Sequence, residues 1–125
     1  MQKIDDKQWK ALKQKFARSK QILPMQLGEP EIEYVTSRGR EILELHAIDF
    51  VRKRIAPAEP KNDGVQTPAK GHPVFIAQHA TGTSDRKKLE KFHAIRAGAA
   101  LTEKQIAYIV DIILRWIEDQ VGHPL

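Results

Sequence analysis

The chain has 125 residues, of which 41% are hydrophobic, 30% charged and only 6% aromatic. This length and balance predict one globular domain, residues 1–125, with an aliphatic core, and they exclude a disordered chain. The absence of cysteine excludes disulfides, thiol nucleophiles and thiolate metal ligands. The formal charge of +5 favours anionic partners of an unspecified kind.

The first predicted helix spans residues 7–20. Trp9, Leu12 and Phe16 recur at the spacing of a buried helical stripe. The range contains no acidic residue and six basic ones, namely Lys7, Lys10, Lys13, Lys15, Arg18 and Lys20. Two interpretations stay open: the helix docks on the core beneath a solvated basic face, or the cations contact phosphates and Trp9 or Phe16 stacks on bases.

A second helix is predicted over residues 30–55, because the segment 22–28 breaks the helical pattern and Pro30 suits a first helical turn. Gly39 indicates a break or a close packing contact inside this helix. His46 lies one turn from the apolar residues Ile42 and Phe50, so we interpret it as a buried histidine with a hydrogen-bond partner.

The segment 56–71 has three prolines, two glycines and no helical period, which predicts an ordered loop or a hairpin arm. We expect residues 65–67 to pair with residues 74–76 as a small antiparallel ribbon. The motif Asn62-Asp63-Gly64 is typical of a turn. The predicted fold class is therefore α+β, a mostly helical single domain with a small central β-ribbon.

Two further helices are predicted in the last third of the chain. Asp85 or Ser84 caps a short helix at residues 86–92. This helix contains a second basic cluster, formed by Arg86, Lys87, Lys88 and Lys91. Thr102 and Gln105 form a capping-box pattern at the start of a helix over residues 102–120. Its apolar stripe predicts the core helix. Residues 1–28 then form a basic helix with its connection, and residues 29–125 form the core of the domain.

Three histidines lie near the apolar run 73–78, and three histidines with water are a typical catalytic zinc arrangement. If that run is extended, however, His72 and His79 are about 23 Å apart at ~3.3 Å per residue and face opposite ways. His93 follows the second basic cluster. We therefore expect no metal site and no cofactor, and we interpret the histidines first as hydrogen-bonded structural residues.

The stretch LHAIDFVRKRIAPAEPKNDGVQTPAKGHPVFIAQHATGTS, with LEKFHAI and LTEKQIAYIVDIILRWIE, resembles the small bacterial and phage family called domain of unknown function 4186. The resemblance covers roughly residues 40–120, and HPVFIAQHAT is its most specific part. It implies no activity. Members of that family usually have cysteines after HAT, which suggests zinc, but Asp85 and Lys88 stand at the corresponding positions here. The resemblance thus implies packing, caps and salt bridges in place of zinc.

The leading hypothesis is a small basic binding module for an anionic macromolecule, either nucleic acid or a nucleoprotein. No recognised DNA- or RNA-binding motif is present, so sequence-specific readout is not expected. The predicted nucleic-acid-binding residues are Lys7, Lys10, Lys13, Arg18, Arg86, Lys87, Lys88 and Lys91. A polar first segment and the lack of a long apolar run predict a cytoplasmic protein without a membrane partner.

Two alternatives remain open. One is a hydrolase, because a carboxylate beside an imidazole performs acid–base chemistry. Its candidate catalytic residues are Asp63, His72, His79 and His93, and its candidate ligand-binding residues are Asn62, Gln66, Gln78 and Thr81. The other is a protein–protein inhibitor or adaptor of the phage type, since an interface needs only a surface patch. The sequence does not indicate an oligomeric state.

Overall fold

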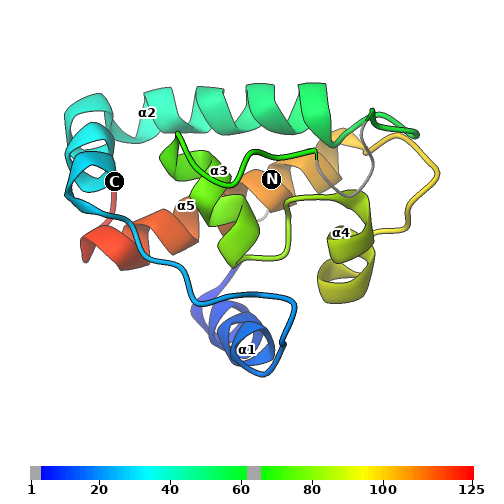
Figure 1. The fold of residues 1–125 in the computed structure, drawn as a ribbon, viewed down its shortest axis with the longest axis horizontal. Coiled ribbons are helices and arrows are strands. Elements are labelled where there is room, and N and C mark those ends of the chain that lie inside the picture. Colours follow the sequence, from blue (N-terminus) through cyan, green and yellow to red (C-terminus); the bar gives the residue numbers. More distant parts are fainter. Residues whose placement is uncertain (1–3, 62–65) are drawn as a thin grey trace.

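The computed structural model describes residues 4–61 and 66–125, which form five α-helices and no β-strand (Figure 1). The helices are α1 (Asp6–Ala17), α2 (Glu29–Arg54), α3 (Pro73–Ala80), α4 (Arg86–His93) and α5 (Glu103–Val121). Four of them match predicted helices within a few residues. The predicted α+β class with a central ribbon is wrong, because the described part of the chain is helical throughout.

The error lies at α3, whose residues 74–76 were expected to be a strand. His72 is the N-cap of this helix, and its Nδ1 accepts a hydrogen bond from the Val74 N–H at 3.0 Å. Pro73 occupies the first helical turn, which its fixed φ angle favours. Every residue of α3 except His79 is buried. A helix buried all round has no polar face and hence no helical period, so its apolar run resembles a buried strand.

The core is built around α5, which packs against both α2 and α3, while α2 and α3 also contact each other. Nine residues of α5 are buried, with Ile109, Ile112, Ile113 and Ile117 fully so. The capping box at Thr102 and Gln105 is present, and Gly122 ends the helix with a φ of 85°. The prediction of α5 as the core helix is confirmed. None of the described helices has the length and apolarity needed to cross a membrane.

Helix α2 changes direction at Gly39, which has φ 82° and ψ 171°. These angles lie outside the helical region and are accessible to glycine without strain. Of the two alternatives predicted for Gly39, the structure has the break and not the close packing contact. In Figure 1 the first turns of α2 are steeply inclined to its long C-terminal part, which runs along one edge of the molecule. Helices α1 and α4 lie away from that edge.

Candidate nucleic-acid interface

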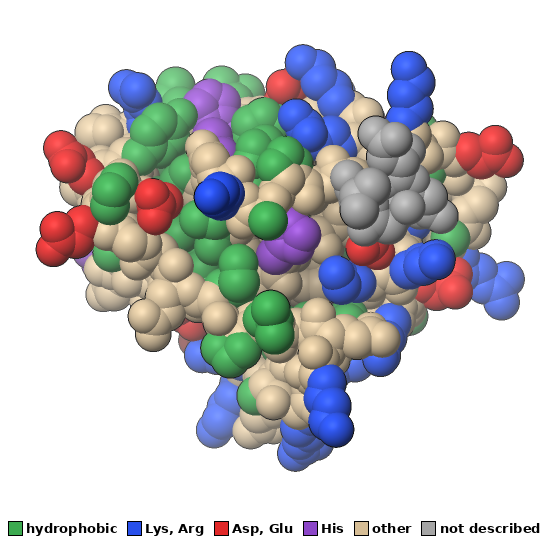
Figure 2. Space-filling view, in the orientation of Figure 1, with side chains coloured by type: hydrophobic (Ala, Val, Ile, Leu, Met, Phe, Trp, Pro, Cys, Tyr) green, Lys and Arg blue, Asp and Glu red, His purple; other side chains and the backbone are tan. Residues whose placement is uncertain are grey.

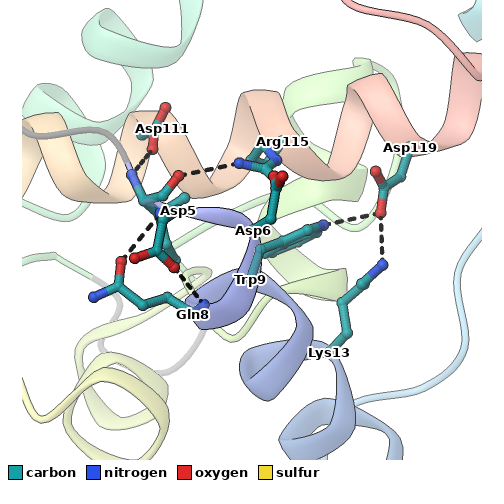
Figure 3. Close-up of polar contacts among 9 residues, drawn as sticks. Asp5, Asp6, Gln8, Trp9, Lys13, Asp111, Arg115 and Asp119 are labelled. Atoms are coloured by element: carbon teal, nitrogen blue, oxygen red, sulfur yellow. Dashed lines mark hydrogen bonds and ion pairs between the residues drawn. The ribbon is translucent and has the colours of Figure 1, made fainter.

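Helix α1, which carries the first basic cluster, is fastened to α5 at its beginning (Figure 3). The N–H of Ile4 donates to Asp111 Oδ2 at 2.6 Å, and the carbonyl of Ile4 accepts from Arg115 at 3.0 Å. The indole N–H of Trp9 donates to Asp119 Oδ2 at 2.9 Å. Both backbone polar groups of Ile4 and the buried indole of Trp9 therefore have hydrogen-bond partners on α5. This fixes the position of α1 relative to the core.

The aromatic side chains of α1 face inward. Trp9 is 2% exposed and Phe16 is 7% exposed. The Phe16 ring meets the Phe92 ring of α4 edge-to-face, with centroids 6.1 Å apart, and it also lies 5.9 Å from the His93 ring. The hypothesis that Trp9 or Phe16 stacks on bases is wrong for this conformation. The structure has the docked helix instead.

The packing of α1 against α4 also brings the two basic clusters together. Lys15 on α1 donates from Nζ to the carbonyl of Phe92, in the last turn of α4, at 3.0 Å. Carbonyls at a helix C-terminus attract cations, so this pairing is favourable. The ammonium groups of Lys15 and Lys91 lie 6.0 and 5.6 Å from the Phe92 ring centroid. Lys15 and Lys91, which are far apart in the sequence, therefore lie near the same aromatic ring and share one face.

We call this face the basic surface. It consists of Lys7 and Lys15 of α1, the C-cap residue Arg18, and Lys87, Lys88 and Lys91 of α4. All are exposed except Lys88, which is half-buried and lies 3.6 Å from Asp85. The other five make no ion pair with a described residue. Figure 2 shows Lys and Arg side chains gathered over the region of α1 and α4.

Two predicted basic residues of α1 lie elsewhere on the helix. Lys13 faces α5 and forms a salt bridge with Asp119 at 3.1 Å. Lys10 is exposed, but it is five residues from Lys15, which places it roughly 140° around the helix from that residue. Lys7 and Arg18 are eight and three residues from Lys15 and so lie on its side of α1. The basic surface is thus a subset of the predicted cluster, with Lys15 at its centre.

Arg86 was predicted to bind nucleic acid, and its placement excludes that role in this conformation. Its side chain is 2% exposed, and its two terminal nitrogens donate to four backbone carbonyls at 2.7–3.2 Å. The acceptors are Ile55, Pro57, Arg96 and Ala99. A planar guanidinium satisfies several carbonyls at fixed angles. Arg86 therefore fastens the start of α4 to the end of α2 and to the loop before α5.

Helices α3 and α4 follow each other in the chain and are joined by residues 81–85. Gly82 in this turn has a φ of 67°, and a Cβ there would lie 2.8 Å from Cδ2 of Phe92. Asp85 is the N-cap of α4, and its Oδ1 accepts from the Lys88 N–H at 2.8 Å, as predicted from the sequence. Only glycine fits both the backbone and the space at position 82, so the turn packs closely against the C-terminal part of α4.

The predicted ligand-binding residues Gln66, Gln78 and Thr81 are all buried. Thr81 donates from Oγ1 to the Ala77 carbonyl at 2.7 Å, and the side-chain amide of Gln78 donates to the Thr83 carbonyl at 3.2 Å. Gln66 is 5% exposed. These side chains lie in the interior, where Thr81 and Gln78 support the backbone. Asn62 and Asp63 lie outside the described residues.

His72 pairs with a histidine that we had interpreted as structural. Because Nδ1 of His72 accepts from Val74, its ring proton is on Nε2, which donates to Nδ1 of His46 at 3.1 Å. The lone pair that a metal would need on Nε2 is therefore occupied by a proton. Burial, with a smaller contribution from nearby His46, lowers the pKa of His72 to about 4. The half-buried His46 also lies 3.4 Å from the hydroxyl of Tyr34.

The other two candidate histidines have different partners. His79 donates from Nε2 to the carbonyls of Thr67 and Pro68 at 3.0 and 3.1 Å. His93 donates from Nε2 to the Thr81 carbonyl at 2.7 Å and accepts at Nδ1 from the Tyr108 hydroxyl at 2.8 Å. Burial lowers the pKa of His93. The structure thus gives the three histidines separate hydrogen-bond partners and does not join them through any of these contacts.

The predicted separation of His72 and His79 is also wrong, because it assumed an extended chain. In the helix these residues are seven positions apart, which corresponds to about 10 Å of rise and to the same side of the helix. The missed signals were local: the sequence His72-Pro73 is a cap followed by a first-turn proline, and Gly82 precedes the cap Asp85. Read together, they indicate two short helices joined by a turn.

Comparison with known proteins identifies a family. The family described as domain of unknown function (DUF4186) matches residues 6–118, which is most of the chain. The matched region begins at the first residue of α1 and extends into the last turns of α5. It therefore includes both helices of the basic surface. No solved structure gives a significant match.

Proposed function

Because the chain belongs to the family described as domain of unknown function (DUF4186), a membership that assigns no activity, we propose a function from its surface. We propose that the protein binds the phosphate backbone of nucleic acid through the basic surface of α1 and α4. The observation that supports this most directly is the contact of Lys15 with the Phe92 carbonyl, which joins two basic clusters into one face.

The remaining charges of the basic surface suit a polyanion. Lys7, Lys15, Arg18, Lys87 and Lys91 are exposed cations without an ion pair among the described residues, so binding a phosphate does not first require an ion pair to break. Each phosphate that they neutralise releases condensed counterions from the nucleic acid. The predicted affinity is therefore electrostatic and steeply dependent on salt.

Titration of a labelled 20-base-pair duplex at several salt concentrations tests this proposal. Contacts from all six cations of the basic surface would give a log–log slope near −5, at about −0.9 per contact. The variant with Lys87→Gln and Lys91→Gln should bind roughly tenfold more weakly at low salt, with a slope smaller by about 1.8. Both side chains are exposed, so the fold should be unaffected.

The matched control is the double variant Arg38→Gln and Lys53→Gln. It removes the same charge from two exposed positions of α2, Arg38 before the change of direction at Gly39 and Lys53 in the long part along another edge of the molecule (Figure 1). We expect it to bind with nearly the affinity of the wild type. Equal losses in both double variants would reduce the effect to net charge and contradict a localised interface. No binding at low salt would contradict the proposed function altogether.

The hydrolase hypothesis stays a prediction without support from the histidines, because His72, His79 and His93 are engaged with different partners. The adaptor hypothesis also stays a prediction. The basic surface favours an anionic partner, and no comparable observation favours the hydrolase or the adaptor hypothesis.

A further inference from the structure

The basic surface offers bases no aromatic side chain on which to stack. All eight aromatic residues of the sequence lie in the described part of the chain, and none is exposed. Trp9, Phe16 and Phe92, which belong to α1 and α4, are 2–7% exposed. The half-buried aromatics are Tyr34 and Phe50 on α2 and Tyr108 on α5. Proteins that bind single strands generally stack bases on exposed aromatic rings, so this surface does not suit open strands.

Helix α4 is instead presented as a rigid, positively charged rod. Its buried side carries Arg86, Leu89 and Phe92, whereas Lys87 and Lys91 are exposed one turn apart. The four carbonyl contacts of Arg86 hold the start of α4, and the packing of Gly82 against Phe92 holds its end. A helix about 10–12 Å wide matches the major groove of B-form DNA, about 12 Å across.

The order of the helices supports the same geometry. α3 is almost entirely buried and supports the turn, and α4 follows it at the surface. Helix–turn–helix proteins share this order of a first helix, a turn and a second helix, and in them the second helix enters the major groove while neighbouring elements contact the backbone. Here α1 supplies those neighbouring cations, because Lys15 lies against the C-terminal turn of α4.

We propose that the preferred ligand is double-stranded DNA, with α4 directed at the major groove and α1 at the adjoining phosphates. This inference rests on the proposed function and specifies its substrate class. Double-stranded RNA has a deep and narrow major groove that side chains do not read, so α4 fits it less well. Single strands lack both the groove and, on this protein, a stacking partner.

The test is a competition at low salt among three unlabelled ligands of equal length, namely duplex DNA, the corresponding single strand and duplex RNA, against labelled duplex DNA. Expressed per nucleotide, duplex DNA should compete at least tenfold better than either of the others. The variant with Lys87→Gln and Lys91→Gln should lose much of this preference, whereas Arg38→Gln with Lys53→Gln should keep it. Two duplexes of different base composition test whether the preference is general.

The outcomes separate this inference from the proposed function. Preferential binding of duplex DNA that depends on Lys87 and Lys91 supports both. Equal or tighter binding of the single strand or of duplex RNA overturns the inference while the proposed function stands. Failure of all three ligands to bind overturns both.

Discussion

Arg86 and Lys87 are neighbours in the sequence with opposite roles in the fold. Arg86 is buried and donates to four carbonyls, whereas Lys87 is exposed. Both were predicted to contact nucleic acid, since a cluster of charges in a sequence does not show which side chain turns inward. A guanidinium has five donors in a planar fork, and an ammonium has three on one atom. The two cations are therefore not interchangeable at position 86.

Replacing Arg86 by lysine tests this difference at constant charge. Arg86→Lys should lower the free energy of unfolding by about 2–3 kcal/mol, because backbone carbonyls in buried and partly buried hydrogen bonds lose their donors. Urea denaturation measures the loss. Lys87→Gln is the control and should change stability by less than about 0.5 kcal/mol. An Arg86→Lys protein as stable as the wild type would show that the fork geometry contributes little.

At the level of the helices, local sequence predicts where an element begins better than how it is buried. α5 starts at its capping box, α4 at Asp85 and α2 near Pro30, each as expected. These ends depend on side chains within a few residues, so they can be read locally. α3 was mistaken for a strand, because Val74, Phe75 and Ile76 favour strands and burial on all sides removes the helical period.

Gly82 connects α3 with α4, and its substitution tests how tightly this unit is packed. Gly82→Ala should cost about 3 kcal/mol, of which ~1–2 kcal/mol is strain at positive φ and the rest is the clash with Phe92. Gly98→Ala is the matched control, because Gly98 also has a positive φ but no atom within 4 Å of the added Cβ. Chemical denaturation compares the two variants.

The difference between these variants isolates the contact with Phe92. Shortening that neighbour, as in the double variant with Gly82→Ala and Phe92→Leu, should recover part of the loss relative to the sum of the single changes. If Gly82→Ala and Gly98→Ala cost the same, the turn has more room than the structure shows, and the rigid presentation of α4 loses its support.

For the molecule as a whole, two half-buried histidines make stability depend on pH. The pKa of His72 is lowered to about 4 and that of His93 is also lowered, both mainly by burial. The unfolded chain therefore binds more protons than the folded one below pH 6.5, the usual pKa of histidine. Stability contributed by the neutral rings is present above that pH and is lost as the pH falls from about 6.5 towards 4.

Urea denaturation at pH 7 and pH 5 measures this effect, and the wild type should be less stable at pH 5. The decrease should be smaller in His72→Asn, since asparagine is a good N-cap that does not titrate, and smaller also in His93→Gln. Equal stability of the wild type at the two pH values would contradict the assignment of neutral, half-buried rings.

The candidate interface shows the same limit of prediction as the fold. Of the eight basic residues predicted to bind nucleic acid, Arg86 is buried and Lys13 is paired with Asp119. Lys15 belongs to the first basic cluster but is not one of those eight residues, and its hydrogen bond to the Phe92 carbonyl links α1 with α4. Hydrogen bonds and salt bridges between distant segments decide which cations remain available to bind phosphates. No pattern within a short stretch of sequence predicts these contacts.

By itself, the sequence determined the charge, the start of most helices and the apolar stripe of α5. Each of these depends on composition or on residues within one or two turns of the chain. Only the tertiary structure decided that α3 is buried on almost every side, that Arg86 is internal and that Lys15 meets Phe92. The last of these contacts joins positions 77 residues apart, and such contacts arise from the packing of α1 and α4 on one core.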